Sequence, residues 1–566
     1  MKWVAADFET SNSPVNIEKE YTRVWLWDVF DPELRKHFNG YDIESFFEYL
    51  FSQNSRILYF HNLKFDGSFI IYYLLNYNFV INDSKQSGTI STLITDRLIW
   101  YTFTVYYKGR KYIFRDSSKK IIGSLEKAAK DFELPISKGE IEYDLHRDEG
   151  YIPTLEEIKY CQRDTEILAD IMEYYYENGM TGITNASDAL KAYKEIVSEN
   201  GYRMYFPTLP KSMDDFIRRS YKGGFCWLNP IHFNEDLRNV YCYDVKSMYP
   251  SVMHDKPLPF GVPLYYDGEY ERDDTYPLFI QEINVCCHRK KGCVPAIQTK
   301  SFMGIKLNYL EDTEGRMQNM ILTSVDLELL YENYEIEEID FVRGLKFQCS
   351  TELFKQYIDY YFELKEKSTG AKKQLYKIFL NSLYGKFAMM TERIQAIPNI
   401  ENDRVHFNRT QPQTVDPIYT AAASFITSWA RKKLIDGINE NYENFVYCDT
   451  DSMHLLAPAQ GVTIGKKLGQ FNLEHGYYDE NKNAHTGIIK ARYLGQKCYV
   501  LGEMTSDGTD LIKKIAGAPN KVKEVVTFDN FRINFETDPY KNPKFRMKNV
   551  KGGVLLIPTK FTIKQK

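Results

Sequence analysis

Two acidic segments far apart in the chain flank a segment rich in lysine and tyrosine. Asp244 follows the apolar run 240–243, and Asp449 and Asp451 lie in the sequence Tyr-Cys-Asp-Thr-Asp-Ser. Carboxylates gathered from distant segments can hold two divalent cations, which stabilise the attacking and the departing oxygen of a phosphoryl transfer. We therefore expect Asp244 and Asp451 to form the principal metal pair of a nucleotidyl-transfer site, with Asp449 supporting it. Tyr249 would crowd the 2′ position of the sugar and exclude ribonucleotides, unless it is a packed core tyrosine.

The segment between these acids has the spacing of a helix. Lys373, Lys377, Asn381 and Tyr384 would share one face, where lysines can neutralise phosphate oxygens and the tyrosine can border a base pocket. An amphipathic helix with a solvated face has the same pattern. That interpretation does not explain why the stripe stands between two acidic segments.

A second set of acids lies in the N-terminal region. Asp7, Glu9, Asp66 and Asp164 could bind two divalent ions about 3.5 to 4 Å apart, and Tyr160 could orient an attacking water. Such a site hydrolyses phosphodiesters. Because Asp7 and Glu9 alone would indicate only a surface strand, the prediction depends on the whole set.

Local patterns predict the elements that would position these N-terminal acids. Residues 2–8 and 57–60 are apolar enough for buried strands, and the helical pattern of 68–76 places Asp66 at a strand-to-helix junction. The segment Thr154–Glu157 is typical of a capping box that opens a long amphipathic helix. The region is therefore expected to alternate strands and helices.

Length and composition indicate a globular protein of several domains. With 566 residues, 43% of them hydrophobic and 26% charged, the chain exceeds one core and suggests roughly three or four packed units. Apolar runs are short, so neither a signal peptide nor a membrane span is expected. Nine scattered cysteines argue against a disulfide framework, and the spacing within 286–293 does not match the usual zinc pairs.

Positive charge is concentrated at the C-terminus. The net charge of the chain is −5, yet residues 541–566 contain eight Lys or Arg and no acid, which suits contact with a phosphate backbone. A solvated basic tail is the alternative interpretation. Most of the 44 tyrosines and 35 phenylalanines must be packing residues, although some could stack on unpaired bases.

The N-terminal acids resemble the motifs of the proofreading 3′-5′ exonuclease of family B DNA polymerases. Asp7-Phe-Glu-Thr is similar to the first motif, Asn62-Leu-Lys-Phe-Asp66 to the second and Tyr160-Cys-Gln-Arg-Asp164 to the third, in the same order. The resemblance implies that further residues handle the unpaired primer end. These are Thr10, His61, Asn62, Phe65, Phe69, Ser117, Lys138 and Tyr143.

The C-terminal segments resemble motifs A, B and C of the family B palm, and Lys497-Cys-Tyr499 resembles its primer-side element. Tyr221-Lys-Gly-Gly narrows the resemblance to the protein-primed, phi29-type bacteriophage DNA polymerases, and it extends over nearly the whole chain. The nucleotide contacts that it implies are Tyr249, Lys365, Lys373, Lys377, Asn381 and Tyr384, and the polymerase-site metal ligands are Asp244, Val245 and Asp451. DNA contacts are implied at Tyr221, Gly223, Gly224, Lys497 and Tyr499.

The resemblance implies an α/β and α+β multidomain fold, with a ribonuclease H-like exonuclease domain and a right-hand polymerase. The turn composition of 177–187 agrees with a first domain that ends near residue 185. The expected divisions are exonuclease 1–185 and polymerase 186–566, the latter comprising palm 186–298 and 415–500, first terminal-protein insertion 299–352, fingers 353–390, second insertion 391–414 and thumb 501–566. The first insertion would contact the terminal protein, and the second would help to close a ring around the template.

Cofactors and partners follow from the same resemblance. We expect two Mg²⁺ ions in each active site, with Mn²⁺ as an alternative, and template-primer DNA and dNTPs as substrates. Further expected partners are a terminal-protein primer and a phage single-stranded DNA-binding protein. The protein is expected to be a monomer in the cytoplasm of an infected bacterium, without membrane contact, and to replicate a linear viral genome by strand-displacing synthesis.

Three other interpretations remain open from the sequence. The chain could be a nuclease whose C-terminal half only grips DNA, a non-catalytic clamp with a decayed palm, or an RNA-synthesising enzyme with the same palm chemistry. Separate loss of nucleotide addition and of excision would discriminate the first two from a proofreading polymerase.

Overall fold

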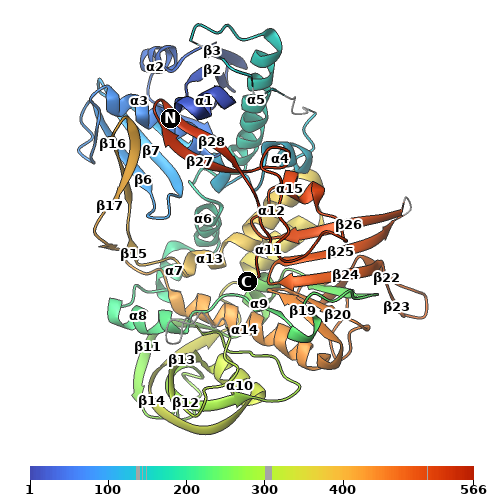
Figure 1. Ribbon diagram of the computed structural model, residues 1–566. Helices are drawn as coiled ribbons and strands as arrows, with labels where there is room; N and C mark the ends of the chain where they lie inside the picture. Colours follow the sequence, from blue (N-terminus) through green and yellow to red (C-terminus); the bar gives the residue numbers. More distant parts are fainter. Residues whose placement is uncertain (136–140, 143–144, 148, 300–308, 506–507, 566) are drawn as a thin grey trace.

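The computed structural model describes residues 1–135, 141–142, 145–147, 149–299, 309–505 and 508–565. Its N-terminal region is built on one mixed sheet with the strand order β3-β2-β1-β4-β8-β7-β6-β5 (Figure 1). The elements of this region are β1 Trp3–Thr10, α1 Pro14–Lys19, β2 Val24–Asp31, β3 Lys36–Gly40, α2 Ile43–Ser52, β4 Arg56–Phe60, α3 Leu63–Asn76, β5 Val80–Ile81, β6 Thr89–Ile94, β7 Trp100–Tyr107, β8 Arg110–Asp116, η1 Ser117–Lys119, α4 Leu125–Asp131 and α5 Leu155–Glu177.

The centre of this sheet is the predicted buried strand at the N-terminus. Strand β1 pairs antiparallel with β2 and parallel with β4, and its residues Val4, Ala5 and Ala6 are fully buried. Helix α5 lies against β1 and β2. It opens with the predicted capping box, in which Thr154 and Glu157 bond each other's backbone N–H. The small Ala5 side chain lies in the same core cluster as Ile167 and Leu168 of α5, which lets this helix approach the sheet closely.

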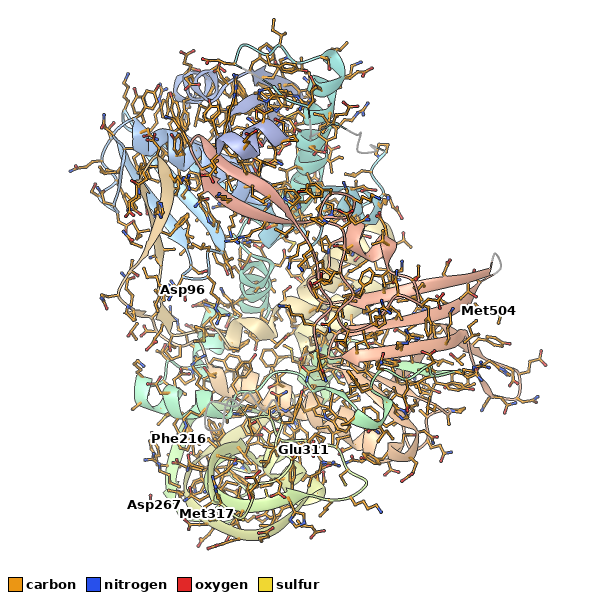
Figure 2. The ribbon with its side chains drawn as sticks, in the orientation of Figure 1. Asp96, Phe216, Asp267, Glu311, Met317 and Met504 are labelled. Carbon is orange, nitrogen blue, oxygen red and sulfur yellow. The ribbon has the colours of Figure 1, made fainter. Side chains whose placement is uncertain are left out.

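The polymerase half contains a five-stranded sheet with the order β21-β10-β20-β19-β9; α14 packs against its strand β20, and α9 packs against α14. A four-stranded sheet, β11-β14-β12-β13, forms the opposite end of the molecule, where Figure 2 labels Asp267 and Met317. The elements up to the helical hairpin are α6 Asn185–Val197, α7 Glu199–Tyr205, α8 Lys211–Ser220, β9 Cys226–Leu228, η2 Pro230–His232, β10 Tyr241–Val245, α9 Met248–Asp255, β11 Leu258–Asp267, β12 Leu278–Arg289, β13 Gln318–Thr323, α10 Ser324–Asn333, β14 Tyr334–Ser350, α11 Lys355–Glu366, α12 Gly370–Ser382 and α13 Tyr384–Phe387.

The C-terminal part contains a further sheet and ends in a hairpin that returns to the N-terminal region. A three-stranded sheet, β24-β25-β26, projects to one side, with Met504 near its outer end (Figure 2). The remaining elements are β15 Glu392–Arg393, β16 Ala396–Glu401, β17 Arg404–Arg409, β18 Gln413–Thr414, α14 Thr420–Asn439, η3 Tyr442–Asn444, β19 Phe445–Asp449, β20 Ser452–Leu455, β21 Phe471–Glu474, β22 Gly476–Tyr478, β23 Ala484–Thr486, β24 Ile488–Gly495, β25 Cys498–Thr505, β26 Gly508–Ile515, α15 Asn520–Val525, β27 Lys544–Val550 and β28 Gly553–Thr559.

The last hairpin, β27–β28, lies across the N-terminal region beside α3 and β17 (Figure 1). The Asn12 side chain bonds both the N–H and the carbonyl of Leu556. Glu20 forms ion pairs with Lys548 of the hairpin and with Arg404 of β17. Three segments that are distant in sequence therefore meet at one place, and much of the basic C-terminal segment packs on the protein and does not form a free tail.

Candidate active sites

The two acidic segments of the polymerase half meet on the five-stranded sheet. Asp244 on β10 faces Ser452 of β20, and Asp449 on β19 faces the same serine, so β19 and β20 form a hairpin beside β10. The Val245 N–H donates to the Asp451 carbonyl across 2.8 Å. Asp244 and Asp451 are therefore neighbours, as the sequence predicted.

The electrostatics of this cluster fit a divalent cation. Burial, followed by the charges of Asp451 and Glu474, raises the pKa of Asp244 to about 7. Burial and the charge of Asp449 raise the pKa of Asp451 to about 6. Carboxylates that repel each other in a half-buried site are relieved by a bound cation, and Mg²⁺ prefers a few carboxylates together with substrate phosphates. The two carboxylate oxygens of Asp449 lie 2.6 and 2.9 Å from Lys497 Nζ. Asp449 is therefore paired with a lysine, which suits its predicted role in supporting the metal pair.

The raised pKa values predict a stability cost in the metal-free protein. An acid whose pKa rises on folding holds its proton more tightly in the folded state. Its stabilising contribution is complete below the unfolded pKa near 3.9 and is lost as the pH rises through about 6 to 7. In EDTA at pH 8, Asp244→Asn should therefore melt at least about 2–4 °C above wild type, the shift that about 1 kcal/mol produces in a domain of about 150–250 residues.

Thermal melts at pH 8 and pH 4.5, with EDTA or Mg²⁺, test this prediction. The difference should shrink at pH 4.5, because Asp244 is then protonated in the wild type. Mg²⁺ should stabilise the wild type more than the variant, since binding to the folded state adds stability. A variant that melts at or below wild type in EDTA at pH 8 would contradict the proposed repulsion.

The glycine-containing segment 221–225 lies directly against the acidic hairpin. The Thr450 N–H donates to the Phe225 carbonyl across 2.6 Å. A Cβ on Gly224 would stand 2.8 Å from Thr450 Cγ2, so this position requires glycine. Tyr221, Gly223 and Gly224, which the sequence assigned to DNA, are therefore held beside the proposed catalytic acids.

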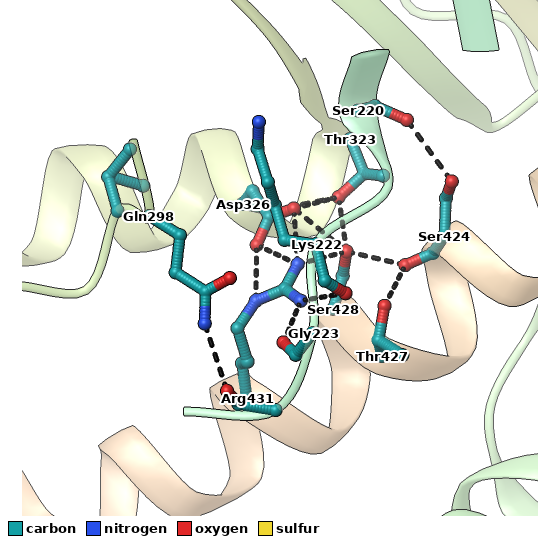
Figure 3. Close-up of polar contacts among 12 residues, drawn as sticks. Ser220, Lys222, Gly223, Gln298, Thr323, Asp326, Ser424, Thr427, Ser428 and Arg431 are labelled. Carbon is teal, nitrogen blue, oxygen red and sulfur yellow. Dashed lines mark hydrogen bonds and ion pairs between the residues drawn. The ribbon is translucent and has the colours of Figure 1, made fainter. Parts of the chain in front are cut away.

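A buried ion pair anchors the same segment from behind (Figure 3). Arg431 on α14 donates to both oxygens of Asp326 on α10, each across 2.7 Å, and both residues are almost fully buried. Arg431 also donates to the carbonyls of Lys222 and Gly223, at 3.0 and 2.8 Å. The sequence analysis missed Arg431, because it is the first of three consecutive basic residues in α14 and nothing in the sequence marks it as the buried one.

The predicted nucleotide contacts lie on and near α12. Lys373, Lys377 and Asn381 are exposed on this helix, at the predicted spacing. Tyr384 begins the separate helix α13, and its ring lies 4.2 Å from that of Tyr249. The expectation of one continuous helix through Tyr384 is thus corrected by a break at residue 383, although the backbone there stays in the helical region.

Two predicted contacts are buried. Lys365 on α11 is 5% exposed, and its Nζ lies 3.2 Å from a Glu366 oxygen. Burial lowers its pKa, and the nearby charges of Lys246 and Lys373 contribute to that shift. Val245 is fully buried, and because its side chain has no donor atom, only its backbone carbonyl could bind a metal.

The N-terminal acids meet at the junction of β1, α3 and α5. Single donor atoms of Asp7, Glu9 and Cys161 lie within 4.8 Å of one another. Burial raises the pKa of Asp66 to about 8, although the Phe8 N–H between the two strand acids bonds its carboxylate. Among the described residues, Asp66 Oδ1 has no hydrogen-bond partner. A buried, unpaired carboxylate oxygen beside other acids fits a bound cation.

The sequence suggested that Asp66 lies at a strand-to-helix junction, but in the structure it lies inside the helix. Helix α3 begins at Leu63, so Asp66 is inside its first turn. The reversal occurs at Asn62, whose φ of 68° is in the left-handed region and whose N–H donates to Asp116 Oδ1 across 3.1 Å. His61 Nδ1 lies 3.0 Å from Ser117 Oγ. The predicted His61, Asn62 and Ser117 are therefore gathered at one edge of the site.

Helix α5 contributes Tyr160 and Asp164 on its buried face, as predicted. The adjacent Thr165 hydroxyl donates to Asp28 Oδ2 across 2.5 Å, and His37 Nδ1 lies 2.8 Å from the same oxygen. Asp28 is the cross-strand partner of Asp7 and is fully buried. Sequence reasoning missed Asp28, because the register of β1 with β2 cannot be read from either strand alone.

The other predicted primer-end contacts differ in their accessibility. Thr10 ends β1, and Phe65 lies 5.5 Å from the Phe69 ring. Phe69 is 1% exposed and packs against Gly553 of β28, so the direct DNA contact predicted for it is not available in this conformation. Lys138 and Tyr143 lie outside the described residues. In the polymerase half, Tyr499 is 9% exposed, and its ring packs 5.2 Å from that of Tyr447.

Comparisons with known proteins agree across the chain. A family model described as "DNA polymerase type B, organellar and viral" matches residues 48–154 and 151–460. The DNA polymerases of Bacillus phages B103 and phi29 are each 36% identical over all of this chain and cover 100% and 99% of their own lengths. The solved structure of phi29 DNA polymerase with primer-template DNA and incoming nucleotides covers 100% of both chains, with a TM-score of 0.90 and 34% identity. The structure of that polymerase with single-stranded DNA gives a TM-score of 0.91.

The same comparisons confirm the multidomain fold that the sequence implied. In the parts of the chain that are described, no helix combines the length and the apolar character needed to cross a membrane.

Proposed function

Since the chain belongs to the organellar and viral type B DNA polymerases and is a DNA-directed DNA polymerase of the phi29 type, we propose that it extends primed DNA at Asp244 and Asp451 and proofreads at Asp7, Glu9, Asp66 and Asp164. The observation that supports the polymerase site most strongly is the 2.8 Å bond from Val245 to Asp451, which brings two distant acidic segments together. Template-primer DNA and dNTPs are the proposed substrates, because phi29 polymerase is seen with both.

In the proposed polymerase site, the protein's own groups bind and orient the nucleotide. Two divalent cations, Mg²⁺ or Mn²⁺, would lower the charge that builds on the reacting phosphate oxygens. Asp244, Asp451 and the Val245 carbonyl would hold them. Lys377, whose charge already lowers the pKa of Asp244, would neutralise a phosphate. The Tyr249 ring, packed on Tyr384, would close the 2′ side of the sugar and thereby favour deoxynucleotides.

In the proposed exonuclease site, the carboxylates would hold cations beside the last phosphodiester of an unpaired primer. Tyr160 would orient the attacking water. The buried, unpartnered oxygen of Asp66 supports this proposal within the described part of the chain. The two sites have no residue in common, so each activity should be separable by substitution.

The wider proposal is protein-primed replication of a linear viral genome in the cytoplasm of an infected bacterium. The sequence divisions given above remain the proposed domains, with 299–352 contacting a terminal protein and 391–414 helping to enclose the template. Contacts of β17 and β27 with the N-terminal region support such an enclosure. Strand-displacing synthesis and assistance by a phage single-stranded DNA-binding protein belong to the same proposal.

An initiation assay tests protein priming. The chain is mixed with the candidate terminal protein, each labelled dNTP in turn and Mg²⁺ or Mn²⁺, and covalent label on the terminal protein is measured by denaturing electrophoresis. We expect an adduct with wild type and none with Asp451→Ala. If DNA-primed extension is intact and no dNTP gives an adduct, the chain is a polymerase that starts only from DNA primers.

A further inference from the structure

The proposed exonuclease site contains a thiol that its proposed chemistry does not use. Cys161 on α5 is fully buried, and its Sγ lies 3.8 Å from the Asp7 carbonyl oxygen. One donor atom each of Asp7, Glu9 and Cys161 lies within 4.8 Å of the other two. In the described residues these three side chains are the one group of His, Cys, Asp and Glu donors gathered this closely.

A second observation points to a cation in the same layer. Asp28 faces Asp7 across the β1–β2 pair, so both side chains project from the same face of the sheet, the face that α5 covers. Asp28 Oδ2 is held by Thr165 and His37, but Oδ1, which is fully buried, has no partner within the described residues. A carboxylate oxygen left unpaired at 0% exposure is costly unless a cation is nearby.

The donor set is suited to a different cation from the one that supports phosphoryl transfer. Zinc-class ions bind thiolate at about 2.3 Å and carboxylate oxygen at about 2.0–2.2 Å, whereas Mg²⁺ prefers oxygen donors only. Small side-chain rotations would bring donors within 4.8 Å of one another to those distances. In the polymerase site Cys448 faces the other side of β19 from Asp449, whereas Cys226 is the cross-strand partner of Asp449 and lies 3.4 Å from the Tyr447 hydroxyl. Within the described residues, neither thiol joins two carboxylates whose donor atoms all lie within 4.8 Å of one another.

We propose that Asp7, Glu9 and Cys161 form a site for a thiophilic divalent cation such as Zn²⁺, which displaces Mg²⁺ and switches off excision while nucleotide addition continues. When the sulfur–metal bond forms, the thiol proton passes to solvent. The binding site rests on the donor geometry and on the buried, unpartnered Asp28 oxygen across the strand pair, as far as the described residues show. The effect on excision rests on the proposed exonuclease function.

Cadmium gives a readout that does not depend on activity. Cd²⁺ is titrated into the EDTA-treated, desalted full-length protein, and the ultraviolet thiolate-to-cadmium charge-transfer band is recorded. We expect a saturable band that is lost in Cys161→Ser and retained in Cys286→Ser. Cys286 is the matched control, because its Sγ also lies near a carboxylate, 3.2 Å from Glu337 Oε2, but outside the proposed site. Asp7→Asn should weaken Cd²⁺ binding by about 10-fold or more.

Excision provides the second arm. With excess Mg²⁺, added Zn²⁺ should inhibit removal of a single-stranded 3′ end by wild type. Inhibition is measured relative to the zinc-free excision rate of each protein. Half-inhibition of Cys161→Ser should require a Zn²⁺ concentration at least about 10-fold higher than that of wild type. Identical Cd²⁺ bands in wild type and Cys161→Ser would overturn the proposal. If Cys161→Ser does not fold, unchanged Cd²⁺ affinity in Asp7→Asn would overturn it instead. A Cys161-dependent band without any excision in Mg²⁺ would support the metal site and refute the exonuclease function.

Discussion

Replacing Asp451 by Ala is expected to lower nucleotide addition by about 10³-fold, while excision of a single-stranded 3′ end continues. Several kcal/mol of transition-state stabilisation come from a metal that is held in place, and each 1.36 kcal/mol corresponds to a factor of ten in rate. Asp451 lies beside Asp244, whereas the acids proposed for excision lie on β1, α3 and α5. Primer extension and degradation of a labelled single strand, measured on the same preparation, check both statements.

A matched variant separates the catalytic effect from a general loss of acidic charge. Asp416→Ala removes an exposed acid outside the named helices and strands of the polymerase half and should keep both activities near wild type. Thermal melts establish that each variant is folded. If Asp451→Ala lowers extension and excision equally, the two activities do not have separate sites.

The same experiment tests the first two interpretations that the sequence left open, the nuclease and the clamp. A nuclease whose C-terminal half only grips DNA would show no metal-dependent extension in wild type. A non-catalytic clamp with a decayed palm would show neither extension nor excision. Family membership already favours the polymerase, and the proximity of Asp244, Asp451 and Lys377 gives the physical reason.

Much of the local structure could be predicted because it depends on short-range chemistry. The strand before Asp244, the hairpin acids and the capping box at Thr154 are each specified by a few neighbouring residues. The start of α3 was placed too late. A left-handed Asn62 caps the helix six residues before the apolar helical pattern becomes clear at residue 68, and its backbone bond to Asp116 is a tertiary contact.

Features that depend on register or on burial between segments could not be predicted. Asp28 becomes part of the N-terminal site only because β2 pairs with β1 in one register. Arg431 is explained by Asp326 and by two carbonyls of the segment 221–225, which lie far from it in sequence. Phe69 was assigned to DNA by resemblance, yet β28 covers its ring. In each case the sequence does not show which distant segment of the chain packs beside the residue.

The double substitution Asp7→Ala with Asp66→Ala is expected to remove excision almost completely and to leave primer extension largely intact. Both residues belong to the carboxylate cluster around β1 and α3, and losing two ligands should cost about 10³-fold or more through the same metal-dependent stabilisation. Extension should persist, since the acids at 244, 449 and 451 lie on a separate sheet. Degradation of a single-stranded 3′ end in Mg²⁺, without dNTPs, is the measurement.

A second double variant in the same domain makes this result interpretable. Glu44→Ala with Glu48→Ala removes two exposed acids from α2, and both activities should stay close to wild type. The catalytic double variant should also raise stability in EDTA, because it removes the buried Asp66, whose pKa is about 8 in the folded protein. Excision that persists in the Asp7 and Asp66 variant would place the nuclease elsewhere, and the carboxylates at β1, α3 and α5 would then need another explanation.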